Sequence, residues 1–125
     1  MRSRFLVGAA VTASALVFGA GAASAHTHVA STTPANGAQV KVLPPTVSVT
    51  FEGQLGRAGV ARITRNGAGN FAGRARLDPR NRSRLLIAVK RPGKAAARRG
   101  VWRVTWRATG VDGHPQQGVF TFRVR

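Results

Sequence analysis

Apolar and polar residues alternate along several short segments of this chain, with the period of two that is typical of half-buried β-strands. Val47, Val49 and Phe51 alternate with hydroxyl side chains. Segments 101–108 and 120–124 repeat the pattern, with mostly bulky apolar side chains on one face and arginine and threonine on the other. Each segment is therefore predicted to be a strand that packs one face against a core.

Weaker patterns predict further strands near 29–32 and at 60–63, 71–77 and 85–89. Turn-forming residues separate the segments at Pro34–Gly37, Pro44–Pro45 and Asn66–Gly67. Residues 94–99 have a helical pattern, which is limited to a single turn within a loop because Pro92 and Gly93 precede it. About seven short strands separated by such turns predict one all-β domain, an immunoglobulin-like Greek-key β-sandwich.

Residues 1–25 have the three parts of an export signal peptide. Arg2 and Arg4 form a cationic start, a mostly apolar stretch follows, and residues 23–25 (Ala-Ser-Ala) match the small-x-small pattern that signal peptidase cuts. Cleavage after Ala25 is predicted to release residues 26–125 as a periplasmic or secreted domain. The alternatives are a cut one or two residues away, or an uncleaved anchor, because the apolar stretch approaches the roughly 20 residues that span a bilayer.

The charge of the chain is extreme, with 20 basic residues against 3 acidic ones. Loss of Arg2 and Arg4 leaves 18 basic residues and a net charge near +15. Such a balance is typical of proteins that bind nucleic acid, anionic lipid or another polyanion. The export signal and the spread of arginines over strand faces argue against a specific nucleic-acid partner. The dense runs 74–84 and 90–99 leave contact with an anionic surface as an alternative.

Cleavage after Ala25 would change the chemistry of His26. The α-amine and the imidazole of a first residue can chelate one metal ion together, once the amine, with an ordinary pKa of about 8, has lost its proton. In the precursor this amine is part of a peptide bond, so the precursor lacks the chelate. The chain has no cysteine, which excludes disulfides, thiolate metal sites and a lipoprotein anchor.

The second candidate ligand group is Asp112-Gly113-His114-Pro115, which is predicted to be the turn between the two most regular strands. Residues two apart in extended backbone point to the same side, so Asp112 and His114 are predicted to face one ligand. An N-terminal strand beside this loop would add His26. Three nitrogens and one oxygen in a roughly planar set suit Cu(II). The alternative is that Asp112-Gly113 is an ordinary hairpin turn and His114 a solvated loop residue.

Together these motifs resemble the CopC copper-resistance family. The resemblance rests on Ala25–His28, on Ser31 with Thr33–Gly37, and on Trp106-Arg107 followed by Asp112–Pro115 and Gly118–Phe122. It implies a periplasmic or secreted β-sandwich that binds Cu(II) and is often encoded beside, or fused to, a CopD-type membrane protein, which is the candidate partner. It also implies that the metal ligands are His26, through its amine and side chain, Asp112 and His114. We further expect a monomer without enzymatic activity.

The chain departs from the family pattern in three places. Many relatives carry a methionine-rich Cu(I) site, but the only methionine here is Met1, which leaves with the signal peptide. Without thioether or thiolate ligands, the processed domain is predicted to bind Cu(I) poorly. Relatives usually have Phe-x-x-Pro-Leu where this chain has Phe51–Leu55. The resemblance also leaves the high positive charge unexplained.

Three other interpretations are consistent with the sequence. His26-Thr27-His28 could wrap Cu(II) with its amine, two backbone amides and the imidazole of His28, and such a site would need neither Asp112 nor His114. Copper monooxygenases also begin with a chelating histidine, although they generally exceed this length. The third interpretation is an exported domain that binds a polyanion, in which the histidines would have no role in binding. We expect sequestration or delivery of Cu(II) rather than catalysis.

Overall fold

The computed structural model describes residues 27–125, and residues 1–26, which include the predicted signal peptide and His26, lie outside the described part. Within the described residues, eight strands and one short 3₁₀ helix follow one another. They are β1 (Val29–Thr33), β2 (Gln39–Val40), β3 (Thr46–Phe51), β4 (Leu55–Arg65), β5 (Ala72–Asp78), β6 (Asn81–Val89), η1 (Ala95–Arg98), β7 (Gly100–Gly110) and β8 (Pro115–Val124). Within residues 27–125, no helix is long and apolar enough to cross a membrane.

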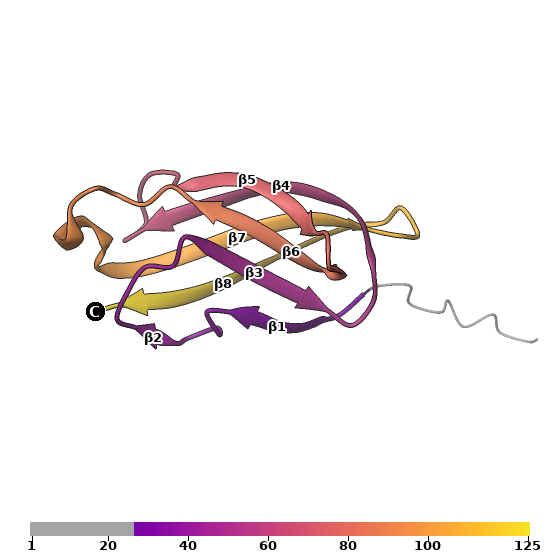
Figure 1. Ribbon diagram of the computed structural model, residues 1–125, viewed down its shortest axis with the longest axis horizontal. Coiled ribbons are helices and arrows are strands. Elements are labelled where there is room, and N and C mark those ends of the chain that lie inside the picture. The colour runs from indigo at the N-terminus through magenta and orange to yellow at the C-terminus, as the bar shows by residue number, and fades with distance from the viewer. Residues whose placement is uncertain (1–26) are drawn as a thin grey trace, which may run out of the picture.

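The strands form two four-stranded sheets that pack face to face (Figure 1). One sheet has the order β1-β3-β6-β5 and the other the order β2-β8-β7-β4. Among the strands of residues 27–125, only β5–β6 and β7–β8 are consecutive strands paired within one sheet. Every other connection between these strands passes from one sheet to the other. The prediction of an all-β sandwich is confirmed.

β2 is a strand that the sequence pattern does not predict. It has two residues, too few to show a period, and it pairs in parallel with the end of β8. The N–H of Gly37 donates to the C=O of Thr121 at 2.7 Å, and the N–H of Arg123 donates to the C=O of Ala38 at 2.8 Å. The predicted turn at 34–37 therefore carries the chain from the edge of one sheet to the edge of the other.

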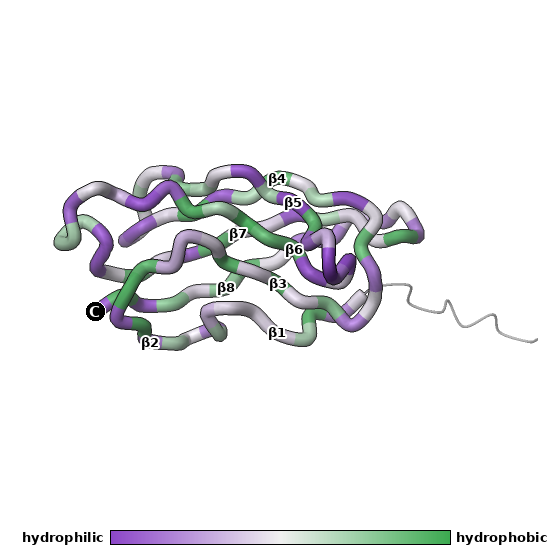
Figure 2. The backbone as a smooth tube through the Cα atoms, viewed as in Figure 1, coloured by the Kyte–Doolittle hydropathy of each residue, from purple (hydrophilic) through white to green (hydrophobic). Residues whose placement is uncertain are grey.

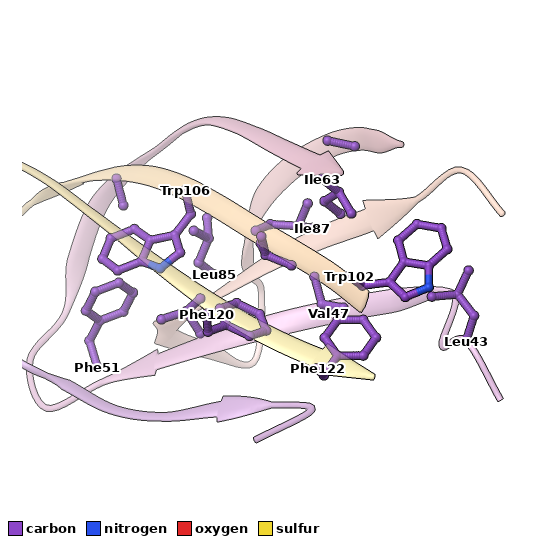
Figure 3. Packing of buried hydrophobic residues seen from close by; sticks show 14 of the residues in the cluster. Leu43, Val47, Phe51, Ile63, Leu85, Ile87, Trp102, Trp106, Phe120 and Phe122 are labelled. Atoms are coloured by element: carbon purple, nitrogen blue, oxygen red, sulfur yellow. The ribbon is translucent and has the colours of Figure 1, made fainter. Parts of the chain in front are cut away.

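The core lies between the sheets and is built from the alternating residues of the regular strands (Figure 3). Trp102, Val104, Trp106 and Ala108 of β7 are buried, while the residues between them are exposed. The ring of Trp106 meets that of Phe51 from β3 edge to face, with centroids 5.1 Å apart. This contact joins the two sheets, and the alternation predicted for 101–108 is confirmed.

Trp102 occupies the other end of the core. Its side chain is fully buried, and its ring lies 5.0 Å from that of Phe71 between centroids. A buried indole N–H needs an acceptor, and here it donates to the C=O of Arg98 at 2.8 Å. The bond attaches η1 to the core, so the predicted single helical turn at 94–99 is confirmed as part of a fixed loop.

Strand boundaries differ most at β4, which has 11 residues where the pattern predicts a strand at 60–63. β4 is an edge strand, and bulges interrupt its pairing with β7 at two points. A bulge breaks the strict alternation of faces, and Val60 is 72% exposed. The period of two that marks a strand is therefore lost. β6 and β8 also begin earlier than predicted, at Asn81 and Pro115.

Gly118 of β8 lies against the indole of Trp106. A Cβ atom built on Gly118 would overlap Cζ2 of the indole and would lie 2.7 Å from Cε2. Glycine is therefore required here by the close approach of a buried ring, since a strand position otherwise favours a larger residue.

Replacing Gly118 by alanine is expected to lower the free energy of unfolding by about 1–3 kcal/mol, because the added methyl group must displace a packed side chain. Urea denaturation of a protein that comprises residues 26–125 measures the effect. Gly93→Ala is the matched control, since a Cβ atom there has no neighbour within 4 Å. Equal stability of Gly118→Ala and the parent protein would contradict the packing of Trp106.

Candidate metal site

Three segments meet at one end of the sandwich: the residues before β1, the β3–β4 connection and the β7–β8 loop (Figure 1). The C=O of His28 accepts a hydrogen bond from the N–H of Glu52 at 2.8 Å. Leu55, at the start of β4, pairs with Gly110 at the end of β7. The β3–β4 connection therefore links the start of the described chain to the β7–β8 loop.

The β7–β8 loop brings Asp112 and His114 into direct contact. Oδ2 of Asp112 lies 3.0 Å from Nδ1 of His114, and Oδ1 accepts the backbone N–H of His114 at 3.0 Å. The side chains are 25% and 63% exposed, respectively. The expected proximity is confirmed, and the segment is the predicted turn between two strands, although its backbone is not extended as the prediction of a common side assumes. The backbone forms a turn, and the carboxylate folds over it to reach His114.

Two glycines make this turn possible. Gly113 has a φ of +83°, in the left-handed region that favours glycine. At Gly110, a Cβ atom would lie 2.8 Å from Oδ1 of Asp112, so a side chain there would displace the carboxylate. The N–H of Gly113 donates to the C=O of Gly110, and the N–H of Gly110 donates to the C=O of His114, each at 3.0 Å. Backbone hydrogen bonds therefore form the loop around the Asp112 carboxylate.

The hydrogen bonds to Asp112 also change its acidity. The backbone N–H of His114, and after it the imidazole of His114, lower the pKa of the Asp112 carboxyl below its ordinary value of 3.8. Hydrogen bonds donated to a carboxylate favour its charged form. Asp112 is therefore an anion at neutral pH, which is the state in which a carboxylate binds a metal ion.

A groove of about 370 Å³ lies between the start of the described chain and β8. Thr27, His28, Trp106 and Gln116 are among its lining residues. Nε2 of Gln116 is buried and has no hydrogen-bond partner within residues 27–125. A Cβ atom at Gly110 would lie 3.3 Å from this nitrogen, so Gln116 reaches the same glycine as the Asp112 carboxylate. The sequence does not predict this position, because a glutamine after a turn has no pattern specific to a metal site.

The structure places two of the three predicted ligands together, and the third, His26, lies outside the described residues. Within residues 27–125, no group of three or more His, Cys, Asp or Glu side chains is arranged to hold a metal ion. Asp112 and His114 are a two-residue group, and a complete site needs donors beyond it. His28 is exposed and lines the groove. The roles of all four residues as ligands stay predictions.

Comparison with known proteins gives one family and several similar structures. The model of the CopC domain family matches residues 29–125, a range that includes Asp112 and His114 and leaves out His26. CopC from Methylosinus trichosporium OB3b is 20% identical, with a TM-score of 0.66, and the match covers 79% of this chain and 93% of that one. No curated protein sequence matches the chain.

PcoC from Escherichia coli, a methionine-rich copper resistance protein, is 25% identical, with a TM-score of 0.66 and coverage of 81% of this chain and 100% of that one. Its selenomethionine form is 23% identical, with a TM-score of 0.63 and coverage of 78% and 99%.

In a metal-free protein that comprises residues 26–125, the pKa of Asp112 is expected to lie below 3.8, as followed by NMR of its carboxyl carbon. His114→Ala should raise this pKa only in part, because the backbone N–H, the larger cause, remains. Since the folded pKa is depressed, the stabilisation by the ionised carboxylate is present above the ordinary pKa and is lost as pH falls through the folded value. A complete return to the ordinary value in His114→Ala would show that the imidazole dominates, contrary to this account.

Proposed function

This chain belongs to the CopC family, and we propose that residues 26–125 form an exported domain that binds one Cu(II) ion through His26, Asp112 and His114. The observation that carries the proposal is the contact of Asp112 with His114 at the end of the sandwich where the described chain begins. PcoC is a copper resistance protein, and we propose the same role for this chain.

The spacing of the two side chains suits one metal ion held between them. Two ligand atoms at right angles around an ion, each about 2.0–2.1 Å from it, are about 2.9 Å apart. Oδ2 of Asp112 and Nδ1 of His114 are 3.0 Å apart. A copper ion would take the place of the proton between these two atoms, and in the neutral imidazole this proton would be carried by Nε2 instead.

His26 would supply the other two donors. Thr27, the next residue, is half-buried beside Gly53, where a Cβ atom would lie 3.1 Å from Oγ1 of Thr27. Together with the bond from Glu52 to His28, this contact fixes the start of the described chain at the end that holds Asp112 and His114. In the proposed site, the α-amine and imidazole of His26 would complete a set of three nitrogens and one oxygen, which suits tetragonal Cu(II).

The same contacts oppose a site wrapped within residues 26–28. Such a site uses the backbone amides of Thr27 and His28 as ligands, so the backbone must curl around the ion. In the structure, the C=O of His28 is hydrogen bonded to Glu52, and β1 begins at the next residue. Wrapping would have to curl the backbone directly next to this attachment, whereas the site with Asp112 and His114 uses no backbone amide of Thr27 or His28.

The donor set favours the storage or transfer of Cu(II) outside the cytoplasm. Residues 26–125 contain neither methionine nor cysteine, so they offer no soft ligand for Cu(I). We propose that the domain becomes periplasmic or secreted after cleavage following Ala25. There it acts as a monomer that sequesters copper or delivers it to a CopD-type membrane protein.

The processed protein beginning at His26 is expected to bind one Cu(II) ion, with a tetragonal electron paramagnetic resonance spectrum that shows nitrogen couplings. A protein with one extra methionine before His26 is the control, since its α-amine becomes an amide. Loss of an outer-shell partner already costs about 10–100-fold in metal affinity, so loss of this ligand should cost at least as much. Equal affinities would exclude the His26 chelate, and tight Cu(I) binding under reducing conditions would contradict the ligand set.

His114→Ala and Asp112→Ala are each expected to weaken Cu(II) binding by at least about tenfold. His28→Ala should have little effect, because its backbone rather than its imidazole is attached to Glu52. Glu52→Gln is the matched control, as it removes another carboxylate at the same end. Parallel competition titrations of the four variants measure the order. If His28→Ala is the most damaging and copper remains bound in denaturant, the wrapped tripeptide is the site instead.

A further inference from the structure

The acidic residues of this chain lie at the same end of the sandwich as the β7–β8 loop with Asp112 and His114. Glu52 follows β3, Asp78 ends β5 and Asp112 lies in the β7–β8 loop, and these are the three acidic residues of the whole sequence. Arginines lie there too, and Arg84 is 3.6 Å from Asp78. The opposite end, which carries η1 and the C-terminal end of β8 (Figure 1), has no acidic side chain in the described structure. Positive charge is therefore unbalanced at that end.

Six exposed basic residues at that end form what we name the cationic pole: Lys41, Lys90, Arg91, Lys94, Arg99 and Arg125. Figure 2 shows the hydrophilic residues of the loop between β6 and β7, which projects from the body. Within residues 27–125, no hydrogen bond or ion pair occupies any of these six side chains. Their charges are thus presented to the surroundings.

Two further arginine side chains, of Arg65 and Arg98, hold the loop between β6 and β7 in place through hydrogen bonds to its backbone. Nε of Arg65 donates to the C=O of Arg99 at 2.5 Å, and its Nη2 donates to the C=O of Ala96 at 3.3 Å. Nε of Arg98 donates to the C=O of Pro92 at 2.6 Å. With the bond from the Trp102 indole, these contacts fix the loop before any partner binds. A pre-formed surface loses less conformational entropy on binding.

Apolar side chains lie among the cations of the pole. Val42 is 66% exposed, and with Leu43, Ala95 and Val124 it lines a depression of about 230 Å³. This volume is below the roughly 300–1,000 Å³ of typical small-molecule sites. The pole is therefore suited to an extended surface rather than to an enclosed ligand.

We propose that the cationic pole binds the surface of an anionic lipid bilayer. Lysine and arginine side chains would meet the lipid phosphates, and Val42 would enter the boundary between headgroups and acyl chains. A soluble polyanion would satisfy the charges but would gain little from an exposed valine. In this orientation the loop with Asp112 and His114 points away from the bilayer.

Sedimentation with vesicles tests this interaction on the metal-free processed protein. Binding is expected to vesicles of phosphatidylcholine mixed with phosphatidylglycerol, to be absent with phosphatidylcholine alone, and to be lost in molar salt. The triple variant Lys41→Gln, Lys94→Gln and Arg99→Gln should partition roughly 100-fold more weakly onto the mixed vesicles. Equal binding to both kinds of vesicle, or no binding to either, would overturn the proposal.

A matched variant separates the pole from the overall charge. Arg57→Gln, Arg76→Gln and Arg107→Gln remove the same charge from exposed strand positions away from the pole, and vesicle binding should stay within about fivefold of the parent protein. If this variant binds as weakly as the pole variant, binding depends on net charge and the pole has no special role.

Val42→Ser distinguishes a bilayer from a soluble polyanion. It should weaken vesicle binding several-fold, because a buried valine contributes through apolar area, and should leave binding to heparin unchanged. No effect on vesicles would assign the pole to soluble polyanions and end the proposal. None of these residues belongs to the copper site, so either outcome leaves the copper titrations unaffected.

Discussion

The uninterrupted pairing of β7 with β8 is the constraint on which the rest of the structure depends. Ten successive residue pairs join the two strands without a bulge. Alternate residues keep to one face only while the register holds, so this pairing buries Trp102 and Trp106. It also fixes where the hairpin turns, and thereby the position of Asp112 and His114. A slip of one residue would turn both tryptophans towards solvent and rebuild the loop.

Regular alternation of apolar and polar residues allowed the central strands to be predicted from sequence, whereas the edge strands show this alternation only weakly. β2 is too short to show a period, and the bulges of β4 remove its alternation. Asp112 and His114 were predictable as neighbours because they are close in sequence. Their contact through a turn, and the approach of Gln116, depend on Gly110 and on strand register, which no local pattern encodes.

The cationic pole is a different case, because it is assembled from distant parts of the chain. Lys41, the loop at 90–99 and Arg125 come together only when β2 pairs with β8 and η1 is attached to Trp102. Sequence shows an excess of basic residues but not their separation from the acidic ones. The fold converts a general excess of charge into two chemically different ends, one built from side chains that suit a metal ion and one from exposed cations.

The length of the β7–β8 hairpin has an electrostatic consequence. β7 has 11 residues, so at about 3.4 Å per residue the two ends are roughly 35 Å apart. The Debye length is about 8 Å at physiological ionic strength. Counter-ions therefore screen almost all of the pole's field before it reaches Asp112. A divalent cation approaching the loop therefore meets the local potential of that carboxylate and of the side chains around it, and the six cations of the pole add little to that potential.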